Sequence, residues 1–261
     1  MKGGSMKTIV FSNQKGGVGK STTASATAAG LYNRGKRVLM VDADPQSNLS
    51  FMNGVDVLNV PATLYDVFTG SADLKDAIQT LKIGLDIVTG GLQLTVADSR
   101  FTDLGRERLL SKALEPIKGN YDFCIIDTNP SLGIITINAM TAADYIVIPI
   151  TADALALQGM MQLSGFINNV RENCNRSDLQ IAGILITMYN DRTRLSRALE
   201  DTINQTADAM DTKVFKSRIR RAQAISDAIA LKADIYEQAP AATATADYNA
   251  FIDELLEGIR G

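Results

Sequence analysis

Short apolar runs alternate with longer amphipathic segments along almost the whole chain. The apolar runs predict strands at residues 8–12, 37–41, 85–88, 123–127, 145–150 and 181–186. The segments between them predict helices at residues 21–33, 106–117, 132–142, 155–172 and 193–210, with a terminal amphipathic helix at 248–256. Strands that are apolar on both faces, in alternation with helices, are typical of a mainly parallel sheet covered on both sides. We therefore expect a doubly wound α/β fold.

Length and composition fit one large domain. The chain has 261 residues, 46% of them hydrophobic, which is enough to build the core of one domain over residues 6–261. Residues 1–5, ahead of Met6, resemble a leader. No apolar run approaches the ~18 residues of a membrane-spanning helix, and no signal-peptide segment opens the chain. The net charge of −3 gives no overall attraction to nucleic acid, so such binding would need a local basic patch.

The few cysteines and the lack of histidine limit the disulfides and metal sites that the chain could form. The two cysteines are Cys124, inside a predicted strand, and Cys174. We therefore expect no structural disulfide and a reducing, cytoplasmic environment. The chain has no histidine and no C-x-x-C pair, so zinc and iron–sulfur sites are not expected.

The most informative motif lies between the first predicted strand and the first predicted helix. It reads Lys15-Gly16-Gly17-Val18-Gly19-Lys20-Ser21-Thr22. A glycine-rich turn in this context lets backbone N–H groups cradle a polyphosphate, and the helix N-terminus adds partial positive charge. In such a loop Lys20 would reach the terminal phosphates and the Ser21 hydroxyl would hold Mg²⁺. The alternative, a glycine-rich turn with solvated lysines, leaves the strand–turn–helix context unexplained.

Polar side chains follow several predicted strands at their carboxyl ends. Asp42 and Asp44 follow the second strand, Asp127 ends the fourth, and Asn190 comes after the sixth. Ligands of open α/β sheets bind at this edge, so the convergence independently supports a nucleotide site. Asp127 can hold Mg²⁺ there, directly or through water. The alternatives are that Asp127 is a helix N-cap or loop acid, and that Asp42 and Asp44 are turn acids before Pro45.

The loop departs from the common phosphate-loop pattern at its start. Gln14 stands where glycine is usual, and Lys15 adds a second lysine. Residues 15–21 resemble the deviant Walker A motif, K-G-G-x-x-K-[ST], of the ParA/MinD family of ATPases. Residues 42–46 match the family's D-x-D-P-Q motif, and residues 149–159 and 188–193 are also similar to family segments. The family's D-x-P-P motif is matched less well, because Asn129 replaces its first proline; this predicts a less stiff loop.

The resemblance implies a P-loop ATPase that uses ATP and Mg²⁺. Lys20 would neutralise phosphate charge, Asp44 would orient or activate the attacking water, and Asp127 would hold Mg²⁺ with Ser21. Lys15 would cross to the partner's phosphates inside an ATP-dependent sandwich homodimer. The guanine signature N-K-x-D is absent at residues 190–193, which favours ATP over GTP. Asn190 would then contact adenine, or else be a plain turn residue.

A basic segment follows the last long predicted helix. Its basic residues, with no acid among them, are Lys213, Lys216, Arg218, Arg220 and Arg221. Such local density in an acidic protein suggests contacts with a phosphate backbone, and a solvated surface is the equally weighted alternative. The resemblance to ParA proteins favours non-specific DNA binding, with Arg218, Arg220 and Arg221 as the main contacts.

Among family members of different function, a ParA-type DNA-partitioning ATPase fits best. The last predicted helix carries Asp253 and Glu254 instead of the basic face of a MinD-like membrane helix, so membrane association is not expected. The chain starts directly on its first strand and so resembles the short form without an N-terminal helix-turn-helix region. The resemblance implies a cytoplasmic, nucleoid-associated protein that segregates plasmids or chromosomes with a ParB-like centromere-binding partner. Positioning of a protein cargo by the same cycle is the alternative.

Overall fold

A computed structural model describes residues 6–189 and 194–259 of the chain. Within the helices it covers, the side chains of residues 154–158 and 194–199 are not described. The predicted leader, residues 1–5, and the predicted adenine contact, Asn190, therefore lie outside the described residues.

One sheet organises the described part of the chain. Its eight strands lie in the order β3-β4-β2-β5-β1-β6-β7-β8. Their bounds are β1 (Lys7–Phe11), β2 (Val38–Ala43), β3 (Ile78–Lys82), β4 (Leu85–Val88), β5 (Phe123–Thr128), β6 (Tyr145–Thr151), β7 (Gln180–Tyr189) and β8 (Val214–Arg220). Every neighbouring pair is parallel except β3 and β4, which form a hairpin. The expected doubly wound, mainly parallel α/β fold is thus confirmed.

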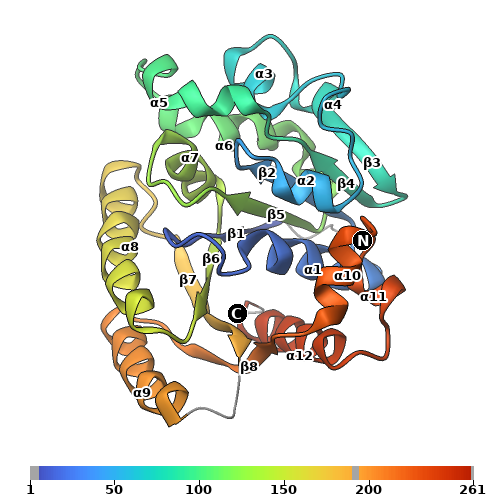
Figure 1. Ribbon diagram of the computed structural model, residues 1–261. Helices are drawn as coiled ribbons and strands as arrows, with labels where there is room; N and C mark the ends of the chain where they lie inside the picture. The colour runs from blue at the N-terminus through green and yellow to red at the C-terminus, as the bar shows by residue number, and fades with distance from the viewer. Residues whose placement is uncertain (1–5, 190–193, 260–261) are drawn as a thin grey trace.

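Helices connect the strands and cover both faces of the sheet (Figure 1). Their bounds are α1 (Lys20–Asn33), α2 (Asn48–Met52), α3 (Leu64–Thr69), α4 (Leu74–Ala77), α5 (Ala97–Arg100), α6 (Leu109–Leu114), α7 (Ile134–Ala142), α8 (Ala154–Asn173), α9 (Arg194–Ala209), α10 (Gln223–Ala230), α11 (Ile235–Gln238) and α12 (Thr243–Gly258). Three 3₁₀ turns are η1 (Leu92–Val96), η2 (Arg106–Arg108) and η3 (Glu115–Asn120).

Each face of the sheet has its own apolar core. Val10 of β1 packs in one core with residues of α6, α7 and α8, whereas Ile9 and Phe11 pack in the other with residues of α1 and α12. Successive strand residues point to opposite faces, so an unbroken apolar strand can serve both cores. The buried strands therefore hold the loops at their carboxyl ends in fixed relative positions.

The structure corrects the sequence-based expectations at several places. Strands β3 and β8 were not expected, because both lie at sheet edges and mix polar with apolar residues instead of forming apolar runs. The helix expected over residues 106–117 is broken into η2, α6 and η3; Pro116 lacks an N–H group and cannot continue an α-helix. The terminal helix α12 begins at Thr243, earlier than expected.

Candidate nucleotide-binding site

The glycine-rich loop runs from the end of β1 to the start of α1, as the sequence predicted. Gly17 and Gly19 have φ of 73° and 80°, in the left-handed region where side chains are strained. Gly19 is the N-cap residue of α1 and offers no side chain to its first N–H groups. Gly16 and Gly17 are exposed. The loop therefore presents uncapped backbone donors, at the positive end of a 14-residue helix, to an anion from outside.

Two residues that the sequence analysis did not identify hold this loop. The Asn13 amide donates to the Pro149 carbonyl at 2.7 Å and accepts from the Lys15 N–H at 3.0 Å. The Thr187 hydroxyl donates to the carbonyl of the buried Val18 at 2.8 Å. Asn13 and Thr187 thereby attach the loop to β6 and β7. Neither residue belongs to a contiguous motif, so only the fold reveals their role.

Lys20 is a buried cation beside two acids. Its side chain turns back over the loop, and Nζ donates to the Lys15 carbonyl at 3.1 Å. Burial lowers the pKa of Lys20, and the nearby charges of Asp127 and Asp44 oppose this shift. The ammonium group is therefore held inside the loop by an acid of β5 and an acid of the loop that follows β2.

Asp127 is the most unusual polar group of the site. It lies within β5, in register with Asp42 of β2, and is fully buried. Neither of its carboxylate oxygens has a hydrogen-bond partner among the described residues. Burial, followed by the charge of Asp42, raises the pKa of Asp127 well above its ordinary value, while Ser21 and Lys20 oppose the shift. The N-cap interpretation of Asp127 is wrong, because the N-cap residue of α7, the helix that follows, is Gly133.

Such an orphaned carboxylate fits a divalent cation. Two buried, unpaired carboxylate oxygens are costly unless a ligand satisfies them. The described residues contain no cluster of three or more His, Cys, Asp or Glu that could hold a metal. Mg²⁺ needs no such cluster, because it binds through one or two protein ligands and completes its shell with water and substrate phosphates. Asp127 and Ser21 therefore fit Mg²⁺ bound together with a polyphosphate.

Asp42 and Asp44 have different surroundings. The Asp42 carboxylate accepts from the Ser50 N–H at 2.7 Å and the Ser50 hydroxyl at 2.8 Å. It also accepts from the Asp44 N–H at 3.2 Å. The Asp44 carboxylate accepts from the Gln46 N–H at 2.9 Å, and its residue is 7% exposed. Asp42 thus supports the loop through Ser50 and Asp44, whereas Asp44 keeps a carboxylate oxygen near the glycine-rich loop and Lys20.

The buried Asp42 should make stability depend on pH. Burial raises the pKa of Asp42 to about 7, above its value in the unfolded chain. The folded protein therefore holds a proton that the unfolded chain has already lost, so the free energy of unfolding should fall as pH rises from about 4 to about 7. The slope attributable to this carboxyl is at most ~1.4 kcal/mol per pH unit.

Urea unfolding of the ligand-free protein at pH 5, 6 and 7 measures this slope. Asp42→Asn should flatten it. The exposed Asp56 and the partly exposed Asp122 have pKa values lowered mainly by hydrogen bonds from Asn59 and Arg37, so the stability that they contribute is lost only below this pH range. Equal slopes for wild type and Asp42→Asn would contradict the prediction.

Lys15 is engaged within its own chain. Its ammonium group forms an ion pair with Asp153 and donates to the Thr151 hydroxyl at 3.2 Å. Thr151 is the last residue of β6, which neighbours β1 on the opposite side from β5. Lys15 and Asp153 are about one-third exposed, 32% and 40% by side chain. In this arrangement Lys15 points to the end of its own β6.

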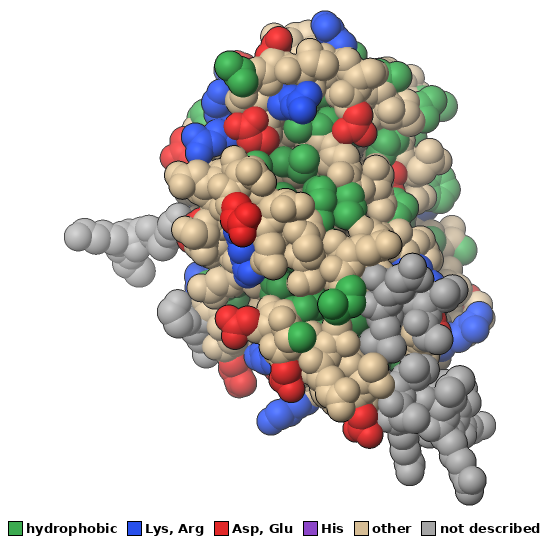
Figure 2. All heavy atoms as spheres, turned by 90° about the vertical axis from the view of Figure 1, so that its left-hand side faces the viewer, with side chains coloured by type: hydrophobic (Ala, Val, Ile, Leu, Met, Phe, Trp, Pro, Cys, Tyr) green, Lys and Arg blue, Asp and Glu red, His purple; other side chains and the backbone are tan. Residues whose placement is uncertain are grey.

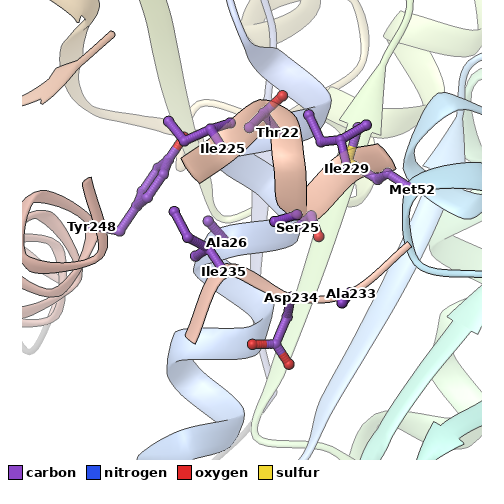
Figure 3. Close-up of a pocket in the computed structure, with 11 residues that line it drawn as sticks. Thr22, Ser25, Ala26, Met52, Ile225, Ile229, Ala233, Asp234, Ile235 and Tyr248 are labelled. Atoms are coloured by element: carbon purple, nitrogen blue, oxygen red, sulfur yellow. The ribbon is translucent and has the colours of Figure 1, made fainter. Parts of the chain in front are cut away.

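A pocket opens beside the glycine-rich loop. It has a volume of about 180 Å³ and is lined by Gly19, Thr22, Met188, Ile219, Arg221 and Ala222, among others. Mixed apolar walls with a few polar groups are typical of small-molecule sites. A second cavity between α1, α10 and α12, where Thr22, Ile225 and Tyr248 converge (Figure 3), has only about 30 Å³, room for about one water molecule. The larger pocket is therefore the better place for a nucleotide base.

The predicted DNA-contacting residues lie along the edge strand β8 and just beside it. Arg218 pairs with Glu200 at 2.6 Å and stacks 4.8 Å from the centre of the Tyr189 ring. Arg220 pairs with Asp247 at 2.6 Å. Lys213 lies over the Phe215 ring, Lys216 is exposed, and Arg221 lines the pocket described above. Four of the five residues therefore lie on or directly before the edge strand β8, whereas Arg221 lies at the pocket beside the glycine-rich loop.

The face of the molecule in Figure 2 carries no large area of one charge among its described residues. Lys and Arg side chains lie among Asp and Glu side chains there, and hydrophobic side chains gather near the middle. This mixture agrees with the net charge of −3. Any attraction to a polyanion would have to come from a local group of residues such as those of β8.

Comparison with known proteins gives close relatives. A family profile described as an AAA domain matches residues 6–181. The sporulation initiation inhibitor protein Soj of Bacillus subtilis (strain 168) is 40% identical over 225 residues, which cover 85% of this chain and 87% of that protein. The chromosome partitioning protein ParA of Caulobacter vibrioides (strain NA1000 / CB15N) is 37% identical over 232 residues, covering 87% and 85% of the two chains.

A solved structure shares the fold over nearly the whole length. The crystal structure of cobyrinic acid a,c-diamide synthase from Mycobacterium smegmatis, with a bound ATP analog and magnesium, superposes with a TM-score of 0.86 at 30% sequence identity. The match covers 98% of this chain and 96% of that chain.

Proposed function

The chain belongs to the ParA-type partition ATPases, and from that membership we propose that it binds ATP with Mg²⁺, pairs with a second copy and holds DNA until hydrolysis. The nucleotide part rests above all on Asp127, whose buried carboxylate oxygens have no hydrogen-bond partner among the described residues and which lies near Lys20 and Ser21 of the glycine-rich loop. A solved relative holding an ATP analog and magnesium supports the same assignment.

Each residue of the site has a defined task in this proposal. Ser21 and Asp127 would hold Mg²⁺, which supplies positive charge to the phosphates when bound. The backbone of the glycine-rich loop and the Lys20 ammonium would bind the phosphate chain, and the pocket beside Thr22 would take the base. Asp44 would orient the attacking water, because phosphoryl transfer depends on positioning more than on covalent chemistry.

Dimerisation would require Lys15 to change partner. In the structure Lys15 pairs with Asp153 and Thr151 of its own chain. To contact the phosphates bound by a second copy, the ammonium must leave this ion pair. A partly exposed ion pair contributes at most about 1 kcal/mol, so phosphate oxygens can compete for Lys15.

DNA binding would use β8 and the residue that follows it. Lys216 and Arg221 can approach phosphates without breaking an ion pair that the structure shows, whereas Arg218 and Arg220 would have to share theirs with Glu200 and Asp247. The binding should be non-specific, because contacts to phosphates carry no sequence information. We further propose a ParB-type partner that stimulates hydrolysis, and a location on the nucleoid. No helix among the described residues is long and apolar enough to cross a bilayer.

DNA co-sedimentation with ATP, with ADP and without nucleotide tests the proposal. Binding should require ATP, ignore sequence and weaken steeply with salt. Lys216→Ala should lower the slope of log K against log salt by about 1, which corresponds to a roughly fivefold loss at 0.15 M salt.

Lys75→Ala is the matched control, since α4 leads into β3 at the opposite edge of the sheet. The control should bind like wild type. Binding that is equal in all three nucleotide states, or strongly selective for sequence, would refute the DNA part of the proposal and leave a nucleotide-binding protein.

A further inference from the structure

One segment touches both loops that surround the phosphate site. Residues 89–98, which we call the brace segment, run from the end of β4 through η1 into α5. The Asp44 loop (residues 42–47) lies at one end of the brace segment. The Asp127 loop (residues 127–133), which leads into α7, lies at the other. None of the motifs in the sequence includes the brace segment.

Contact with the Asp44 loop is made by backbone. The Gly91 N–H donates to the Ser47 hydroxyl at 3.0 Å. A Cβ added to Gly90 would lie 2.6 Å from the Asp44 carbonyl oxygen and 2.8 Å from that of Asp42. Only glycine allows this approach, so the brace segment packs directly against the backbone of the Asp44 loop.

Contact with the Asp127 loop is made by a carboxylate. Asp98 Oδ1 accepts from the N–H of Ile134, the first residue of α7, at 2.6 Å. A Cβ added to Gly133 would lie 2.6 Å from the same oxygen. A negative charge is favoured at a helix N-terminus, and hydrogen bonds to charged groups are the stronger ones. Asp98 therefore fixes the point where the Asp127 loop ends.

Buried residues spaced along the brace segment anchor it in the core. Thr89 is fully buried, and its carbonyl accepts from the Leu64 N–H at 2.8 Å. Leu94 and Ala97 are buried among the apolar side chains that cover the sheet. These buried contacts attach the brace segment to the sheet between its two loop contacts.

We propose that Asp98, acting through the brace segment and the Gly91–Ser47 contact, holds the Asp44 and Asp127 loops in one relative geometry. This rests on the proposed function, because hydrolysis needs Mg²⁺ at Asp127 and the attacking water at Asp44 to be aligned at the same time. Asp98 is a positioning residue: it acts through Ile134 and Ser47, and it makes no contact with the nucleotide in this proposal.

Hydrogen–deuterium exchange of the ligand-free protein tests the coupling directly. Asp98→Ala should speed exchange about three- to tenfold in residues 133–137, and also in residues 44–51, which Asp98 does not bond. Asp98→Asn keeps an oxygen acceptor and should behave nearly like wild type. Asp103→Ala, an exposed acid on the same connection, is the matched control. Faster exchange confined to residues 133–137 would overturn the proposal.

Steady-state kinetics give the second readout. Asp98→Ala should lower kcat for ATP hydrolysis about tenfold while KM for ATP changes less than about threefold, and Asp98→Asn should restore most of the rate. A rise in KM alone, or an unchanged kcat, would refute a positioning role. If wild type itself hydrolyses no ATP, the proposed function fails, while the exchange experiment still decides whether the two loops are coupled.

Discussion

Lys20→Ala is expected to weaken ATP binding about 100-fold or more, equivalent to ~2.7 kcal/mol. The ammonium group is buried inside the glycine-rich loop, and its present contacts are a backbone carbonyl and the charges of two acids. Without Lys20, phosphates entering the loop would meet Asp44 and Asp127 with no lysine between them. Like charges at such short range in a buried site repel strongly.

Titration with a fluorescent ATP analogue in the presence of Mg²⁺ measures this effect. Lys36→Ala is the matched control, because Lys36 is exposed in the turn after α1. Urea unfolding shows whether Lys20→Ala is folded, so that loss of binding is not confused with loss of structure. A dissociation constant within about threefold of wild type would show that the nucleotide does not bind through Lys20.

Asp127→Asn is expected to make the ligand-free protein more stable and the enzyme inactive. The carboxylate is buried, has no hydrogen-bond partner among the described residues, and lies near two other acids. Removing its charge should raise the free energy of unfolding at pH 8 by ~1–3 kcal/mol. The same change removes the ligand that fits Mg²⁺, so Mg²⁺-dependent ATP hydrolysis should fall at least about 100-fold.

Asp122→Asn is the control for Asp127→Asn, because Asp122 directly precedes the same strand, β5. Asp122 is partly exposed and pairs with Arg37 at 3.0 Å, so its loss should leave hydrolysis intact and stability unchanged or slightly lower. Denaturant unfolding and phosphate release measure the two effects together. If Asp127→Asn lowered stability and kept hydrolysis, Asp127 would be a structural residue and the metal assignment would be wrong.

The strand–turn–helix geometry around the glycine-rich loop was predicted well because its signal is contiguous in the sequence. Eight residues from Lys15 to Thr22 specify a turn whose backbone angles at Gly17 and Gly19 depend mainly on local sterics. The apolar runs predicted the strands of the sheet. Because ligands of such sheets bind at the carboxyl edge, Asp42 and Asp127 were expected to lie close together. The register of β2 and β5 confirms this, since it pairs these two residues directly.

The edges of the fold were harder to predict. Strand β8 has an exposed polar face, so its residues were interpreted only as a basic segment. The fold pairs Arg218 with Glu200 and Arg220 with Asp247, which lie 18 and 27 residues away along the chain. Charge counting along a segment cannot find acids that approach from other elements, so the free positive charge at β8 is smaller than the sequence suggests.

By itself, the sequence determined the glycine-rich turn between β1 and α1, the mainly parallel sheet and the edge of the sheet at which the polar residues gather. Tertiary structure alone decided that Asp127 has no hydrogen-bond partner among the described residues and that Lys15 pairs with Asp153. It also decided how the Asp44 loop and the Asp127 loop are joined. The physical reason is sequence distance. Gly91 meets Ser47 across 44 residues and Asp98 meets Ile134 across 36, and such contacts form only when separate elements pack on one sheet. Local sterics can be inferred from neighbouring residues, whereas burial and pairing depend on the whole fold.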